Sequence, residues 1–190
     1  MCSSDLAMFG FRDLAEHLIG KHPGHIDTRG RESMTPMHVA AKAGYADVLS
    51  LLLEHGADVD VRDIFGITPL YWASRSGKLK AGQFLLDRGA DINARGNRGE
   101  TPLSGALFER RVEFARMLLT RGASINTHGS SGYTPLYWAL EKKNIEAVRM
   151  LLEYGANVNA YNNRNRTPFQ LTTQPEIVEL LSKYGIKSVE

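Results

Sequence analysis

Residues 68–100, TPLYWASRSGKLKAGQFLLDRGADINARGNRGE, decide the fold, because the landmarks of this stretch return along the chain at intervals of 33 residues. Thr-Pro pairs stand at Thr35-Pro36, Thr68-Pro69, Thr101-Pro102, Thr134-Pro135 and Thr167-Pro168. Leucine pairs keep the same phase at Leu52-Leu53, Leu85-Leu86, Leu118-Leu119 and Leu151-Leu152. Each leucine pair is followed by Gly-Ala and then by a triplet in which an apolar residue stands between two polar ones, such as Asp91-Ile92-Asn93. Three motifs in one phase predict an array of repeated structural units.

One unit is expected to contain two helices and a turn. Thr before Pro is typical of a helix start, since the hydroxyl caps a free amide and Pro has no N–H to leave unpaired. Small residues such as Ala40 and Ala73 in the first helix favour close packing of neighbouring helices. The second helix carries an apolar stripe, for example Val48, Leu51 and Leu52, that should face a core. The glycine after each leucine pair predicts the helix end.

These motifs resemble the ankyrin family, whose pattern runs Thr-Pro-Leu-His, Ala-Ala, Gly-His, Leu-Leu and Gly-Ala-Asp-Val-Asn. The resemblance implies an all-α solenoid of helix–turn–helix units joined by β-hairpin fingers, with a concave groove that binds proteins in most members. The chain departs from the pattern at the motif His, which is present only as His38 and is replaced by Tyr71, Ser104, Tyr137 and Gln170. The glycine between the helices is likewise replaced by Arg110 and Lys143. These losses weaken local turns without threatening the fold.

We expect a single domain over residues 1–190, with about five to six repeats. The predicted units are an atypical one at 1–34, full ones at 35–67, 68–100, 101–133 and 134–166, and a shortened cap at 167–190. The first unit lacks Thr-Pro and carries Leu6, Met8, Phe9 and Phe11, which would leave an apolar end. We therefore expect weak self-association there, and a chain that is the C-terminal part of a larger multidomain protein.

The composition excludes several classes of protein. Lysine and arginine number 23 against 21 acidic residues, a formal charge of +2, so no nucleic-acid partner is expected. The sequence has no apolar run of about 18 residues to span a membrane, and the first residues do not resemble a signal peptide. The single cysteine, Cys2, fits a reducing compartment. The predicted location is intracellular, in the cytoplasm, with the nucleus left open.

No catalytic motif and no cofactor site is evident in the sequence. A nucleophile–base pair and a Gly-rich phosphate loop are both missing. His22 and His25 flank a Pro-Gly turn and have no carboxylate or cysteine companion, so a metal site is not predicted. Trp72 and Trp138 stand at equivalent positions two units apart and are expected in the core between helices. The chain is therefore predicted not to be an enzyme.

The candidate binding residues are those that the repeat framework leaves free. In the family's geometry, fingertips and the ends of the first helices face the groove. The phase of the repeat places the candidates at these positions, as Arg29, Arg62, Ile64, Phe65, Ile67, Arg75, Arg95, Arg98, Phe108 and Tyr133. Apolar groups flanked by arginine are typical of interface hot spots. They predict a protein or peptide partner that is acidic and carries an apolar anchor.

Other interpretations stay open at this point. Phe65 and Ile67 would pack between fingers, or the arginines would be solvated charges that keep the array soluble. Alternatively, Arg62, Arg95 and Arg98 would grip a small phosphorylated ligand with Tyr133 or Phe65 stacked on it. The array would also serve as the targeting arm of a larger enzyme or switch protein.

Overall fold

The computed structural model describes residues 26–185, and this part of the chain is helical. Its elements, in chain order, are η2 (Arg31–Ser33), α3 (Pro36–Ala43), α4 (Ala46–Glu54), α5 (Pro69–Ser76), α6 (Leu79–Asp87), α7 (Pro102–Phe108), α8 (Val112–Thr120), α9 (Pro135–Glu141), α10 (Ile145–Glu153), η3 (Pro168–Leu171) and α11 (Pro175–Lys183). The predicted first unit lies almost wholly outside the described residues. The same holds for Leu6, Met8, Phe9 and Phe11, on which the expected self-association depends.

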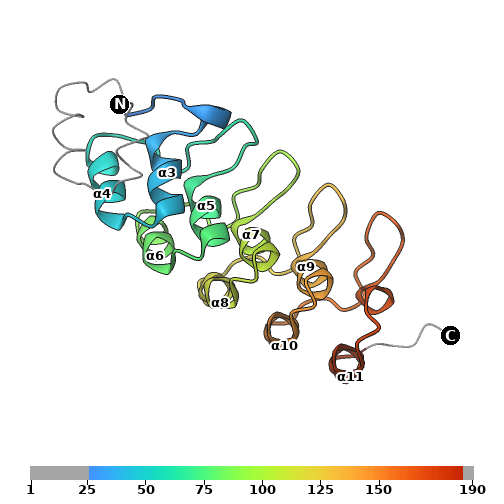
Figure 1. Cartoon of the computed structure of the whole chain (residues 1–190). Coiled ribbons are helices and arrows are strands. Elements are labelled where there is room, and N and C mark those ends of the chain that lie inside the picture. The colour runs from blue at the N-terminus through green and yellow to red at the C-terminus, as the bar shows by residue number, and fades with distance from the viewer. Residues whose placement is uncertain (1–25, 186–190) are drawn as a thin grey trace.

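The helices form two parallel rows with loops projecting on one side (Figure 1). We call α3, α5, α7, α9 and the short η3 the A row, and α4, α6, α8, α10 and α11 the B row. Each A helix packs against the next one, as α3 does on α5 and α5 on α7, and against the B helix that follows it. The long loops that join a B helix to the next A helix project as fingers (Figure 1). This arrangement confirms the predicted helical solenoid.

The A helices begin at the prolines of the Thr-Pro pairs, as the sequence predicts. Hydroxyl capping, in contrast, varies from helix to helix. Thr101 Oγ1 accepts a 3.3 Å hydrogen bond from the Ser104 amide, and Ser104 Oγ accepts one from the Thr101 amide. At α9 the residue in the position of Ser104 is Tyr137, and Thr134 Oγ1 is buried without a hydrogen-bond partner. The tyrosine side chain does not accept a hydrogen bond from the Thr134 amide as Ser104 Oγ does from the Thr101 amide.

The core runs along the interface between the two rows. The leucine pairs contribute Leu52, Leu85, Leu118 and Leu151, all buried, and the small residues Ala40, Ala73, Ala106 and Ala139 are fully buried between A helices. The turns between paired helices end at Gly44 and Gly77 in the left-handed region, where a glycine fits without strain. Arg110 and Lys143 hold the same left-handed backbone with φ of 58° and 51°. The departures from the family pattern are thus absorbed as local strain.

The β-hairpin form expected for the fingers is not confirmed, because no β-strand forms between residues 26 and 185. In the second finger the Asp63 amide donates to the Ile67 carbonyl at 3.1 Å. Asp63 Oδ1 accepts the amides of Phe65 and Ile67, both at 2.9 Å. The side chain therefore takes the amide hydrogens that a hairpin ladder would use. Neighbouring fingers are joined by backbone bonds, such as Asn97 N–H to Phe65 O at 2.8 Å.

Candidate functional site

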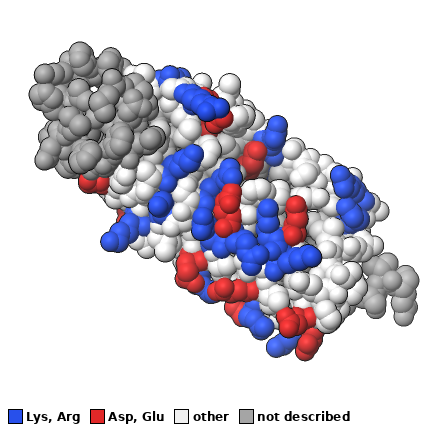
Figure 2. Space-filling view, viewed as in Figure 1, with Lys and Arg blue, Asp and Glu red and all other residues white. Residues whose placement is uncertain are grey.

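Two hollows lie side by side where the fingers meet the A row. The first, which we call the Phe108 hollow, has a volume of about 450 Å³ between the third and fourth fingers. The second, the Phe65 hollow, has a volume of about 550 Å³ between the second and third fingers. Both are lined by Tyr71, Arg75, Arg98 and Glu100. They therefore form one groove, and basic and acidic side chains gather over the middle of this face (Figure 2).

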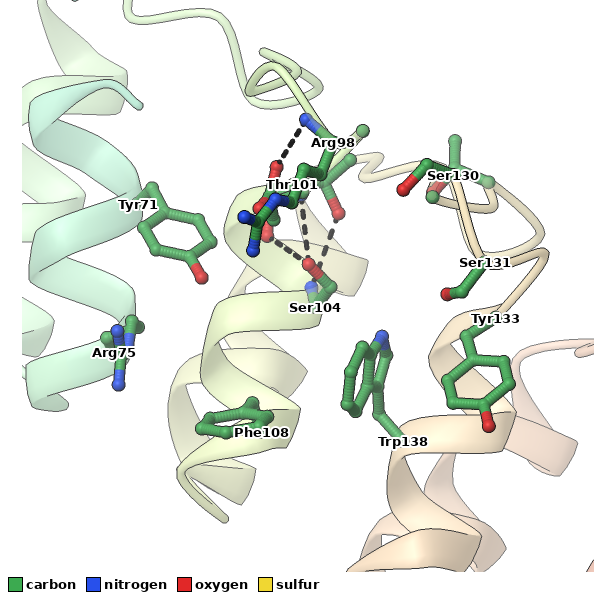
Figure 3. Close-up of a pocket in the computed structure, with 14 residues that line it drawn as sticks. Tyr71, Arg75, Arg98, Thr101, Ser104, Phe108, Ser130, Ser131, Tyr133 and Trp138 are labelled. Carbon is green, nitrogen blue, oxygen red and sulfur yellow. Dashed lines mark hydrogen bonds between the residues drawn. The ribbon is translucent and has the colours of Figure 1, made fainter. Parts of the chain in front are cut away.

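Aromatic rings form the wall of the Phe108 hollow. Phe108 meets Trp138 edge to face at 5.4 Å between ring centroids, and Tyr133 meets Trp138 in the same way at 5.4 Å. Tyr133 also stacks on Tyr137 at 5.3 Å, and Tyr137 donates its hydroxyl to the Ala160 carbonyl at 3.1 Å. In Figure 3 the Trp138 ring stands between α7 and α9 and the Phe108 ring lies at the lower part of α7, both below the serine residues of the fourth finger. The wall is thus fixed by ring packing before any ligand arrives.

Cations lie over the rings of the groove. Arg75 lies 5.8 Å from the Trp72 ring centroid and 5.4 Å from the Phe108 ring centroid, and it forms an ion pair with Glu109. Lys142 lies 3.8 Å from the Phe108 centroid, and Lys42 lies 4.8 Å from the Trp72 centroid. Such contacts stabilise a cation over an aromatic face. The floor of the groove is therefore both apolar and basic.

The ladder of arginines at equivalent finger positions makes contacts within the array. Arg29 Nη1 donates to the Arg62 carbonyl at 2.8 Å, Arg62 Nη1 to the Arg95 carbonyl at 2.7 Å, and Arg95 Nη2 to the His128 carbonyl at 2.8 Å. Each guanidinium thus binds the backbone one repeat further along the chain. These side chains remain exposed, and they line neither hollow. Their contacts order the fingers relative to one another.

The second fingertip divides into exposed and buried residues. Ile64 and Phe65 are 59% and 47% exposed, whereas Ile67 is 5% exposed. An added Cβ at Gly96 of the next finger would lie 2.6 Å from Ile67 Cδ1, so Ile67 fills the space that this glycine leaves. Phe65 and Ile67 line the Phe65 hollow, and Ile64 points elsewhere on the fingertip. Phe65 is therefore the side chain of this finger that combines exposure with a place in the groove.

Arg98 has an unpaired guanidinium at the junction of the two hollows. Its backbone amide donates to Glu100 Oε2 at 2.9 Å, but its side chain has no hydrogen bond or ion pair within residues 26–185. Figure 3 shows the side chain extending from the finger toward Tyr71 and Ser104. Burial raises the pKa of the Tyr71 hydroxyl above its ordinary value, so Tyr71 stays neutral beside this charge. Arg75, Arg98, Phe108 and Tyr133 are the predicted site residues that meet in one hollow.

The two tryptophans were not predicted to lie in the groove. Both are half-buried; Trp72 lines the Phe65 hollow and Trp138 the Phe108 hollow, and Trp138 also packs on the core. Trp72 Nε1 donates to Asp63 Oδ2 at 3.0 Å, which ties α5 to its finger. A signal was present in Gly105, which occupies the same phase in the intervening repeat. A core position that alternates between tryptophan and glycine is implausible, because neighbouring layers need matching volumes.

Neither a metal centre nor a membrane segment is found in the described part of the chain. No group of three or more histidine, cysteine or acidic side chains there is arranged so that it could hold a metal ion. No helix between residues 26 and 185 is long and apolar enough to cross a membrane. His22 and His25 lie outside these residues.

Comparison with protein-family models gives two matches. Residues 4–96 match a model of ankyrin repeats in three copies, and residues 118–171 match a model of ankyrin repeats in many copies. No curated protein matches the chain significantly. Ankyrin repeats generally mediate protein–protein interaction, and the proteins that carry them are typically non-catalytic scaffolds. With its phased motifs, its two rows of helices and these matches, the chain belongs to the ankyrin-repeat family.

Proposed function

We propose that this protein binds a segment of another protein in the groove formed by the Phe108 and Phe65 hollows. The proposal depends chiefly on one observation: three cations without a carboxylate partner among residues 26–185 lie at the groove or over its rings. Arg98 lines both hollows, Lys42 lies over the Trp72 ring and Lys142 over the Phe108 ring. Exposed rings provide contact area, and unpaired cations provide attraction for negative charge. The partner we propose is acidic and carries an apolar anchor.

The groove is suited to binding because its parts are already ordered. Fingers are joined by backbone hydrogen bonds and by the arginine ladder, and the rings of the wall pack on one another. A partner that docks here does not have to order the scaffold. Affinity gains directly from that preorganisation, since ordering of loops and side chains is a main cost of association.

A small phosphorylated ligand is the weaker alternative. It would need Arg62, Arg95 and Arg98 to converge on one phosphate, but Arg62 and Arg95 already donate to finger carbonyls. Among residues 26–185, Arg98 is the one arginine at the groove whose guanidinium has no hydrogen bond or ion pair. One arginine provides less charge than a phosphate site usually uses, so the groove supports a phosphorylated ligand less well than a protein segment. A role as the targeting arm of a larger enzyme or switch protein is compatible with binding at this groove.

The test is differential capture with matched variants. Immobilised wild-type protein, a groove variant (Phe108→Ala with Arg98→Glu) and a control variant (Tyr154→Ala with Arg149→Glu) are exposed to the same cell extract. The control pair is exposed on α10 and at its end, in the B row, so it matches the groove pair in residue type. We expect partners that the wild type and the control retain and the groove variant loses. Identical retention by all three proteins would contradict the proposal.

Titration calorimetry with a recovered partner then measures how much binding free energy each substitution removes. Phe108 is 37% exposed, so its truncation should leave folding almost intact. If the ring is a binding anchor, Phe108→Ala should cost about 1–3 kcal/mol of binding free energy. Association should also slow with rising salt, because screening weakens the attraction between an acidic partner and the basic groove.

A further inference from the structure

The two hollows of the groove offer two separate apolar contacts with one charge between them. Phe108 and Trp138 face the first hollow, and Phe65 and Trp72 face the second. Arg98 is common to both, and its guanidinium is unpaired within the described residues. The order along the groove is therefore apolar, basic, apolar. A partner complementary to this order is apolar, acidic, apolar.

The acidic groups of the groove restrict where a partner's carboxylate fits. Glu100 lines both hollows, and its Oε2 accepts the backbone amide of Arg98. Glu32 lines only the Phe65 hollow and lies at its far side from the Phe108 hollow. Glu109 is already paired with Arg75. Glu32 would repel a negative group placed deep in the Phe65 hollow, whereas the Glu100 carboxylate at the junction is already engaged by the Arg98 amide and the unpaired Arg98 guanidinium attracts a carboxylate there.

The distance between the hollows sets the spacing of the two apolar residues. The hollows are one repeat apart, and packed helices lie about 8–10 Å from each other. A chain in the extended polyproline II conformation advances about 3.1 Å per residue and has three residues per turn, so side chains three positions apart lie on one face about 9 Å from each other, which matches the separation of the hollows. A helical segment advances about 1.5 Å per residue and would need about six or seven. Spacing thus distinguishes an extended partner from a helical one.

The rim of the Phe108 hollow favours the extended form. Ser130 and Ser131 line it, and neither hydroxyl donates a hydrogen bond within residues 26–185. Both lie above the rings of Phe108 and Trp138 in Figure 3. An extended backbone exposes carbonyl groups along its length, whereas a helix uses its carbonyls internally. Hydroxyl donors at the rim can therefore bind the carbonyl groups of an extended peptide but not those of a helix.

We propose that the groove recognises an extended peptide in polyproline II conformation, in which two large apolar residues stand three positions apart with an aspartate or glutamate between them. One apolar side chain enters the Phe108 hollow and the other enters the Phe65 hollow, while the carboxylate pairs with Arg98. This inference rests on the proposed function, since it specifies the partner of the same groove. It adds a sequence pattern that the partner must carry.

The experiment is selection from a displayed library of random peptides of about 12 residues, long enough to span both hollows in extended form. Wild-type protein should enrich peptides with two apolar residues three positions apart and an acidic residue between them. Arg98→Ala should still enrich the apolar pair without the acidic preference, and Phe108→Ala should enrich one apolar residue only. Arg149→Ala and Tyr154→Ala are the matched controls and should select the wild-type pattern.

A synthetic copy of the most enriched peptide gives the size of the effect. Exchange of its acidic residue for glutamine or asparagine, or Arg98→Ala in the protein, should weaken binding about 10- to 100-fold, as expected for loss of a charged hydrogen bond. Enrichment of apolar residues seven positions apart, or an acidic preference that survives Arg98→Ala, would overturn the inference while leaving groove binding intact. Failure to enrich any peptide over the groove double variant Phe108→Ala with Arg98→Glu would count against the inference and the proposed function together.

Discussion

Replacing Arg62 with alanine tests whether the arginine ladder stabilises the array. Arg62 Nη1 donates to the Gly66 carbonyl in its own finger at 2.8 Å and to the Arg95 carbonyl in the next finger at 2.7 Å. A hydrogen bond to a charged group contributes about 1.5–3 kcal/mol net, and water replaces much of each bond at this exposed site. We expect Arg62→Ala to lower the free energy of unfolding by about 1–2 kcal/mol.

Urea denaturation followed by far-ultraviolet circular dichroism measures this loss. With an m-value of about 2 kcal/mol/M, the midpoint should fall by about 0.5–1 M. Amide exchange locates the effect, because the Asn97 amide donates to the Phe65 carbonyl at 2.8 Å across the same pair of fingers. Its exchange should accelerate, since the bond opens when the fingers separate.

The matched control is Arg98→Ala, one finger along the chain. Its side chain has no hydrogen bond or ion pair among the described residues, so the free energy of unfolding should change by less than about 0.5 kcal/mol. Equal midpoints for Arg62→Ala and Arg98→Ala, with unchanged exchange at Asn97, would refute a structural role for the ladder. The arginines would then be available for a partner, as the sequence had suggested.

Four further residues of the array give predictions of stability. Leu118→Ala removes a fully buried side chain from the middle of the array and should cost about 2–5 kcal/mol in urea denaturation. Gly82→Ala should destabilise the fold by about 1–2 kcal/mol despite better helix propensity, because the added Cβ would overlap the buried Phe114 ring. Lys143→Gly should raise the free energy of unfolding by about 0.5–1 kcal/mol, since glycine adopts the left-handed backbone without steric strain. Burial lowers the pKa of His38 below its ordinary value of 6.5, so the unfolded chain binds protons first as the pH falls. Thermal unfolding of the wild type should therefore lose stability below about pH 6.5, and His38→Gln should reduce that loss.

The fold was predictable from sequence because its signals are local and repeated. Thr-Pro fixes where an A helix begins, and glycine after the leucine pair fixes where a B helix ends. These are effects of neighbouring residues on one backbone, and the 33-residue period repeats them. The finger geometry was predicted less well, because Asp63 takes backbone amides that a β-hairpin would pair, and an aspartate alone does not reveal that preference.

The candidate site was predictable only in part, for a different reason. The phase of Arg98 and Phe108 predicted a fingertip and the end of an A helix, and both residues line the Phe108 hollow. The contacts of Arg62 were not foreseen, because its partner is a backbone carbonyl 33 residues away and every residue has such a carbonyl. Trp72 was assigned to the core because a large apolar ring on a helix usually packs there.

The arginine ladder links the order of the fingers to the recognition of a partner that we propose for the groove. Arg62 and Arg95 hold the second, third and fourth fingers at fixed separations, and Arg98, Ser130 and Ser131 are carried on those fingers. A change at Arg62 would therefore weaken binding even if Arg62 never touched the partner, because it loosens the finger that faces the one carrying Arg98. Loss of affinity on ladder substitution is for that reason no evidence of contact. Arg98 separates the two effects, since its guanidinium is free of structural bonds within residues 26–185, and any loss of affinity there reports on the partner itself.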